Sequence, residues 1–106
     1  MKKIECIIRP ERFETLKKQL IDHGVGGMTI SDVRGFGRQT SRPDNYLILP
    51  KLKIDIYCND DQVEELIETI LTVCRRNELG DGKIAVLNVD EIVRVRTGER
   101  QTEAIL

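Results

Sequence analysis

Hydrophobic periodicity changes abruptly between residues 51 and 74, and this change limits the fold more than any other feature of the sequence. Apolar side chains first alternate with polar ones, as in a strand with one buried face, at Leu52, Ile54, Ile56 and Cys58. An apolar stripe with helical spacing follows, at Val63, Leu66, Ile67, Ile70, Leu71 and Cys74. Asn59 and Gln62 between them resemble a capping box. The stretch therefore predicts a strand that leads directly into an amphipathic helix.

The other segments complete a recognisable order of elements. Strand patterns occupy residues 4–9, 28–34 and 84–89, and the strand before the capping box restarts at Leu47. A helical pattern follows Pro10 and ends before Gly24. A short last strand is expected over residues 92–96. The order β-α-β-β-α-β, with an extra C-terminal strand, predicts an α+β, ferredoxin-like fold.

Right-handed crossovers place both helices on one face of such a sheet. The other face would carry Ile7, Val33 and residues of the fourth strand, and we expect it to be too apolar to stay in water. The sequence therefore predicts that this face is covered by further copies of the chain.

Composition excludes several classes of function. The 106 residues suffice for one domain, and their formal net charge is −1, so the chain lacks the basic excess typical of nucleic-acid binding. Aromatic residues make up 4% and tryptophan is absent, which disfavours base-stacking surfaces. Neither a signal-peptide core nor a membrane-length apolar segment is visible, so we expect no membrane insertion and a cytoplasmic location.

The cysteines and the single histidine have structural explanations. Cys6, Cys58 and Cys74 form no CxxC pair and lie in apolar patterns, so we expect buried free thiols. His23 stands at the end of the first predicted helix, where it complements the helix dipole more readily than it serves as a ligand or catalyst.

Residues 79–84, here called the glycine turn, contain the strongest local signal for a ligand. Gly80 and Gly82 permit backbone N–H groups to converge on an anion, and Lys83 adds a cation. Arg94 and Arg96 have strand spacing, so their guanidinium groups would project from one face. Together they suggest a site for a phosphate chain. The alternative is a helix cap, a tight turn and solvated arginines.

Six motifs in this order resemble the PII nitrogen-regulatory signal proteins, and the resemblance extends from residue 1 to about residue 105. They occupy residues 1–5, 27–29, 33–39, 49–54, 80–84 and 93–100. The resemblance implies one PII-like domain over residues 1–106, assembled as a homotrimer, that binds ATP or ADP in clefts between subunits. It also implies a non-catalytic protein that regulates an enzyme, a transporter or a regulator protein through an exposed T-loop, here about residues 37–50.

The resemblance assigns ligand-binding residues by position. One subunit would contribute Gly27, Met28 and Thr29, with Thr29 near the adenine, and the neighbouring subunit would contribute the glycine turn. The full nucleotide-binding set is Gly27, Met28, Thr29, Gly35, Phe36, Gly37, Arg38, Tyr57, Gly80, Asp81, Gly82, Lys83, Arg94 and Arg96. Gln39 would help to hold Mg and 2-oxoglutarate, and Lys51 would pair with a carboxylate of 2-oxoglutarate. No catalytic residue is implied.

Two departures from the family pattern bear on the effector and the partner. The loop between Gln39 and Lys51 is several residues shorter than usual, and Tyr46 is a weak candidate for the family's modified tyrosine. Tyr57 replaces a small aliphatic residue near the adenine pocket, and Ala85 stands where the family often has an aromatic residue. An alternative is therefore a PII-like sensor of AMP, a cyclic nucleotide or bicarbonate. Two further alternatives, independent of these departures, are a small acylphosphatase-type hydrolase and a purely structural assembly module. The C-terminal segment, residues 97–106, is polar until its last three residues.

Overall fold

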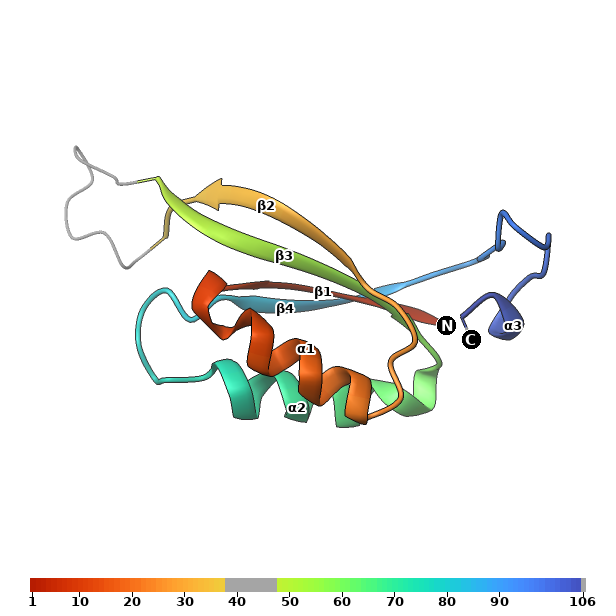
Figure 1. Cartoon of the computed structure of the whole chain (residues 1–106), viewed down its shortest axis with the longest axis horizontal. Helices are drawn as coiled ribbons and strands as arrows, with labels where there is room; N and C mark the ends of the chain where they lie inside the picture. Colours follow the sequence, from red (N-terminus) through yellow and green to blue (C-terminus); the bar gives the residue numbers. More distant parts are fainter. Residues whose placement is uncertain (38–47, 106) are drawn as a thin grey trace.

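The computed structural model describes residues 1–37 and 48–105, and it confirms the predicted order β-α-β-β-α-β (Figure 1). The strands and main helices are β1 (Lys2–Ile8), α1 (Phe13–Asp22), β2 (Thr29–Gly35), β3 (Leu49–Cys58), α2 (Val63–Cys74) and β4 (Lys83–Asn88). The 3₁₀ turns η1 (Pro10–Arg12) and η2 (Asp60–Gln62) precede the two main helices, and a short helix α3 (Thr102–Ile105) lies near the C-terminus. Residues 38–47, which include most of the expected T-loop, are outside the described part.

The four strands form one antiparallel sheet in the order β2-β3-β1-β4. β1 and β3 are central, so β2 and β4 are the two edge strands. Both main helices lie against the same face of this sheet, as the right-handed crossovers predict (Figure 1). The second and fourth strands of the chain therefore lie at opposite edges of the sheet, which matters for the site described below.

The core lies between the sheet and the helices. Alternate residues of β1 and β3 are paired across the strands and buried, for example Ile4 with Ile56 and Cys6 with Ile54. Leu16 and Leu20 of α1 pack onto them, together with the predicted stripe of α2 apart from Leu71. The expected burial of all three thiols is confirmed, and burial raises the pKa of the Cys6 thiol to about 12.

The starts and ends of the helices follow the sequence signals. The Gln62 side chain accepts a hydrogen bond of 2.8 Å from the Asn59 backbone N–H, as a capping box requires. His23 is the C-cap of α1, and its ring Nδ1 lies 2.6 Å from Glu65 Oε1 on α2. None of the described helices is both long and apolar enough to cross a bilayer.

The sheet face opposite the helices is more polar than the sequence suggested. Lys3 Nζ lies 3.5 Å from carboxylate oxygens of Glu5 and Asp55, and Lys53 Nζ lies 3.7 Å from Glu5. The Asp55 carboxylate raises the pKa of Lys3. The expectation of a predominantly apolar face was wrong, because alternation along β1 and β3 places this ion-pair cluster between the apolar residues of the edge strands.

The expected last strand over residues 92–96 is also wrong. A single bridge joins Val93 to Arg100, and residues 95–97 form a turn. The Gly98 N–H donates to the Arg94 carbonyl at 2.7 Å, and Gly98 has φ of +73°. This turn folds the segment back on itself, so residues 94 and 96 do not share the face of a strand.

Candidate functional site

The glycine turn links α2 to β4 through two backbone conformations that favour glycine. Gly80 has φ of +92° and Gly82 has φ of +109°. A Cβ on Gly82 would lie 1.8 Å from the backbone oxygen of Ile7 in β1. The glycines are therefore required by the backbone geometry of this turn and by its close approach to β1.

The Asp81 carboxylate stabilises the turn from inside. Its Oδ2 accepts the backbone N–H of Arg76 at 2.7 Å and that of Glu78 at 3.3 Å. These hydrogen bonds, the one from Arg76 foremost, hold the pKa of Asp81 below its ordinary value. The sequence had placed Asp81 among the nucleotide ligands, and in the structure its side chain organises the turn.

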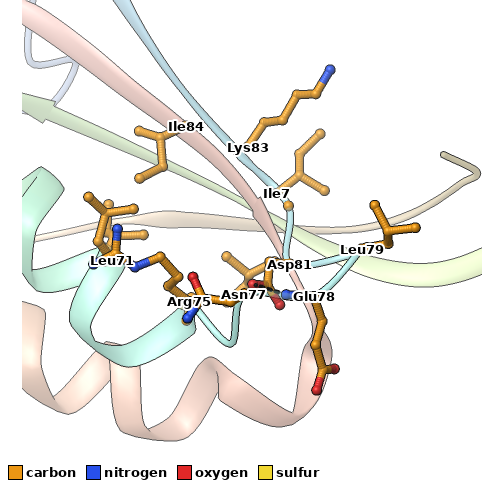
Figure 2. A pocket seen from close by; sticks show the side chains of 13 residues that line it. Ile7, Leu71, Arg75, Asn77, Glu78, Leu79, Asp81, Lys83 and Ile84 are labelled. Atoms are coloured by element: carbon orange, nitrogen blue, oxygen red, sulfur yellow. Dashed lines mark hydrogen bonds between the residues drawn. The ribbon is translucent and has the colours of Figure 1, made fainter. Parts of the chain in front are cut away.

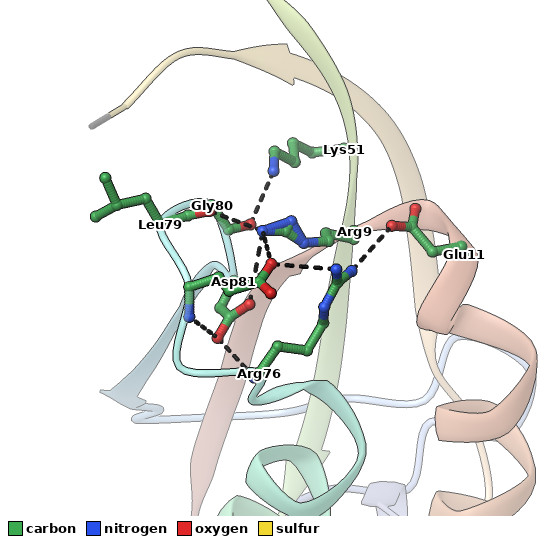
Figure 3. A network of polar contacts seen from close by, with 8 residues as sticks. Arg9, Glu11, Lys51, Arg76, Leu79, Gly80 and Asp81 are labelled. Carbon is green, nitrogen blue, oxygen red and sulfur yellow. Dashed lines mark hydrogen bonds and ion pairs between the residues drawn. The ribbon is translucent and has the colours of Figure 1, made fainter. Parts of the chain in front are cut away.

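Two cations hold carbonyl groups of the turn (Figure 3). Arg9 Nη2 donates to the Leu79 carbonyl at 2.7 Å, and Lys51 Nζ donates to the Gly80 carbonyl at 2.9 Å. Burial, aided by the charge of Arg9, lowers the pKa of Lys51. Arg9 was not among the predicted site residues. The only feature of the sequence that could have drawn attention to Arg9 was its position at the end of the first predicted strand, immediately before Pro10.

A cavity of about 640 Å³, here called the turn pocket, lies beside the glycine turn (Figure 2). Its wall is mostly apolar, with charged groups from the turn. The lining residues are Ile7, Ile8, Ile70, Leu71, Cys74, Arg75, Asn77, Glu78, Leu79, Asp81, Gly82, Lys83 and Ile84. Lys83 is exposed at the start of β4, and its side chain extends away from α2 (Figure 2). A cation beside a glycine-rich turn suits an anionic ligand.

A second hollow of about 310 Å³, here called the Met28 pocket, gathers five other predicted residues. They come from the end of the α1–β2 connection and the start of β2, from the end of β3, and from the residues that follow β4. Its lining is Gly26, Gly27, Met28, Thr29, Asp55, Tyr57, Arg94, Ala104 and Ile105. The sequence did not single out the contribution of Ala104 and Ile105, because only tertiary structure brings α3 to this pocket.

Arg94 is held by its own segment. Its Nη1 donates to Glu99 Oε1 at 2.9 Å, and its Nη2 donates to the Glu103 carbonyl at 3.0 Å. The Thr97 hydroxyl also donates to Glu99 at 2.7 Å and contributes most to holding the pKa of Glu99 below its ordinary value. Arg96 is exposed in the following turn.

The two pockets share no lining residue and lie at opposite edges of the sheet. Lys83 begins β4 and Thr29 begins β2, with β1 and β3 between them. At the usual separation of neighbouring strands, these edges are about 14 Å apart. One copy of the chain does not bring the two groups of predicted residues together.

The remaining predicted residues lie at the base of the expected T-loop. Gly35 ends β2, and Phe36 and Gly37 follow it, with Phe36 exposed. Arg38, Gln39 and Tyr46 lie outside the described residues. Within residues 1–37 and 48–105, no group of three or more His, Cys, Asp or Glu side chains is placed to hold a metal ion.

Comparison with known proteins gives consistent matches over the whole chain. The family model described as nitrogen regulatory protein P-II matches residues 1–99. Nitrogen regulatory protein P-II of Synechocystis is 45% identical, and that of Nostoc punctiforme 43%, each over 99% of this chain and 100% of the relative. The crystal structure of Arabidopsis thaliana PII bound to citrate superposes with a TM-score of 0.82 at 43% identity, covering 98% of this chain and 88% of that one.

Proposed function

The chain belongs to the nitrogen regulatory protein P-II family, a family of non-catalytic signal transducers, and from this premise we propose that it binds ATP or ADP between the subunits of a homotrimer. The glycine turn of one subunit would hold the phosphates, and the Met28 pocket of its neighbour would hold the adenine end. The acylphosphatase alternative is set aside, since the family is non-catalytic.

The position of the two pockets at opposite edges of the sheet carries this proposal. In a closed ring of copies, one edge of each subunit faces the other edge of the next, so the two half-sites meet at every interface. Neither pocket alone provides both a phosphate-binding turn and an adenine pocket. The arrangement explains why the predicted residues divide into two separate groups in a single chain.

The residues present fit an adenine nucleotide. The phosphates require cations and N–H donors, which the glycine turn and Lys83 supply. A Mg ion bound with ATP would neutralise part of the phosphate charge, and we propose Gln39 as a residue that assists it. Phe36 and Gly37 would border the phosphates from the base of the T-loop.

We propose 2-oxoglutarate as a second effector whose carboxylate is bound by Lys51. Lys51 Nζ donates to the Gly80 carbonyl, so a carboxylate would compete with that hydrogen bond. Tyr57 lines the Met28 pocket and would influence which base or effector fits there. Calorimetry with ATP, ADP, AMP, 2-oxoglutarate and bicarbonate would identify the effectors.

The signalling loop is proposed to be short. The alignment with P-II of Nostoc punctiforme extends over 112 positions, whereas this chain has 106 residues, so the alignment contains gaps in this chain. We assign the missing residues to the T-loop, about residues 37–50, which would contact a regulated enzyme, transporter or regulator protein of nitrogen or carbon metabolism in the cytoplasm. A shorter loop has fewer accessible conformations and reaches a smaller part of a partner.

Substitution of Lys83 tests the nucleotide site. We expect Lys83→Ala to weaken ATP binding by about 1–3 kcal/mol, the range for a hydrogen bond to a charged group. Lys18→Ala, which removes an exposed cation from α1, should leave the affinity unchanged. Isothermal titration calorimetry measures both. Equal dissociation constants for Lys83→Ala and the wild type would contradict the assignment of the phosphate site.

A further inference from the structure

Arg9 was not among the predicted ligand-binding residues, and yet its side chain donates to the Leu79 carbonyl of the glycine turn at 2.7 Å. We propose that Arg9 is a positioning residue: it fixes the orientation of the Leu79–Gly80 peptide so that the Gly80 N–H faces a bound phosphate. The phosphate part of this inference rests on the proposed function. The positioning part concerns the free protein and can be tested without a ligand.

The orientation follows from the geometry of the peptide unit. In a trans peptide, the carbonyl and the N–H point in opposite directions. Arg9 Nη2 draws the Leu79 carbonyl to itself at 2.7 Å, so the Gly80 N–H is directed away from Arg9. The Lys51 hydrogen bond fixes the Gly80 carbonyl in the same manner. The Asp81 N–H is then used inside the turn, where it donates to the Glu78 carbonyl at 3.3 Å.

The surroundings of Arg9 indicate that the carbonyl contact determines its place. Its side chain is only 16% exposed, and its Nη2 is 3.7 Å from Asp81 Oδ1 and 3.9 Å from Glu78 Oε2. These distances allow charge compensation but exceed hydrogen-bond length. Arg9 Nε and Asp81 Oδ1 are buried without a hydrogen-bond partner among the described residues. The Leu79 carbonyl is thus the group that Arg9 binds at hydrogen-bond distance in this network.

Arg76 provides a matched comparison within the same network (Figure 3). Its guanidinium lies 3.1 Å from Glu78 Oε2 and 3.8 Å from Glu11 Oε1. Its contact with the turn is made by its backbone N–H, which donates to Asp81 and survives substitution. Replacing Arg76 therefore removes the same charge from the network without removing a side-chain hydrogen bond to a carbonyl of the turn.

The test compares Arg9→Met, Arg9→Lys and Arg76→Met in the full chain. Backbone hydrogen exchange of Gly80 and Asp81 is measured by NMR in the free protein, and the ATP dissociation constant by calorimetry. We expect Arg9→Met to accelerate exchange of the Asp81 N–H and to weaken ATP binding, each about tenfold, as for loss of one charge-assisted hydrogen bond. Arg76→Met should leave both values within about twofold, because the Arg76 contact with the turn is made by its backbone N–H, which the substitution keeps.

Arg9→Lys keeps the inference testable if Arg9→Met does not fold. A lysine retains the charge but places it on a compact ammonium instead of the planar guanidinium whose Nη2 donates to the Leu79 carbonyl, so it should show the same changes to a smaller degree. Unchanged exchange and affinity in the folded Arg9 variants, or equal losses in Arg76→Met, would overturn the inference. Absence of ATP binding by the wild type would instead refute the proposed function, and the exchange rates alone would then decide the role of Arg9.

Discussion

Gly82 is the residue whose identity the backbone dictates most strictly. Its φ is +109°, and a Cβ would overlap the Ile7 backbone oxygen at 1.8 Å. Because the clash is with backbone, it cannot be relieved by rotation of a side chain. The sequence predicted glycines here for anion binding, and the structure adds that the path of the chain from α2 into β4 requires one.

We expect Gly82→Ala to lower the free energy of unfolding by about 2–4 kcal/mol, through strain at positive φ and displacement of β1. Urea denaturation measures the change. Gly26→Ala is the matched control, since a Cβ there meets nothing within 4 Å; its stability should stay within about 0.5 kcal/mol of the wild type. Equal stabilities for the two variants would show that β1 and the turn move apart without cost.

The Asp81 carboxylate gives the protein a defined sensitivity to acid. Its pKa is depressed in the folded state by backbone N–H donors, so its stabilising effect is fully present above the unfolded pKa of 3.8 and is lost as the pH falls through the lower, folded pKa. In Asp81→Asn, we expect a shallower decline of stability below about pH 5. Urea titrations at a series of pH values test this. An identical decline in both proteins would assign the acid sensitivity to other carboxylates.

At the scale of elements, the strand-to-helix transition at residues 58–63 was predicted most completely. Alternation, capping box and apolar stripe all appear where the sequence places them, because each depends on neighbouring residues. The structure refines the transition by inserting the 3₁₀ turn η2 before α2. Residues 92–100 show the opposite case. The spacing of residues 92–96 suggested a strand, but the turn at Gly98 and the Val93–Arg100 bridge fold the chain back on itself.

Removal of the capping interaction should weaken α2 specifically. We expect Gln62→Ala to reduce the free energy of unfolding by about 0.5–2 kcal/mol, because the Asn59 N–H loses its acceptor. Thermal or urea unfolding followed by circular dichroism measures the effect. Gln19→Ala on the exposed side of α1 is the control, and a loss in Gln19→Ala as large as that in Gln62→Ala would argue against a capping role.

At the scale of the whole molecule, the proposed interface site predicts complementation between variants. Lys83→Ala damages the turn pocket and Arg94→Ala damages the Met28 pocket. In mixed trimers from co-expression in equal amounts, an interface is intact only where the Arg94→Ala subunit supplies the turn pocket and the Lys83→Ala subunit supplies the Met28 pocket. Random assembly gives this combination at about one quarter of the interfaces. We expect ATP binding to return to about that fraction of sites, at a nucleotide concentration where neither variant binds alone.

The fraction of occupied sites is measured by calorimetry on the purified mixture, with subunit composition from mass spectrometry and trimer mass from light scattering. Mixing the separate variants without exchange of subunits is the control and should restore no binding. If co-expressed trimers also bind no ATP, both half-sites belong to the same subunit and the interface site is refuted.

The sequence by itself determined the order of the four strands and two main helices, the composition of the core and the position of the glycine turn. These depend on local periodicity, caps and turn residues, which each segment carries in its own residues. Only the tertiary structure decided that Arg9 and Lys51 hold the carbonyls of the turn, that α3 lines the Met28 pocket, and that the two pockets lie at opposite edges of the sheet. Those contacts join residues that are distant in the chain. They are set by the order of the strands in the sheet, which the local pattern of each segment does not specify.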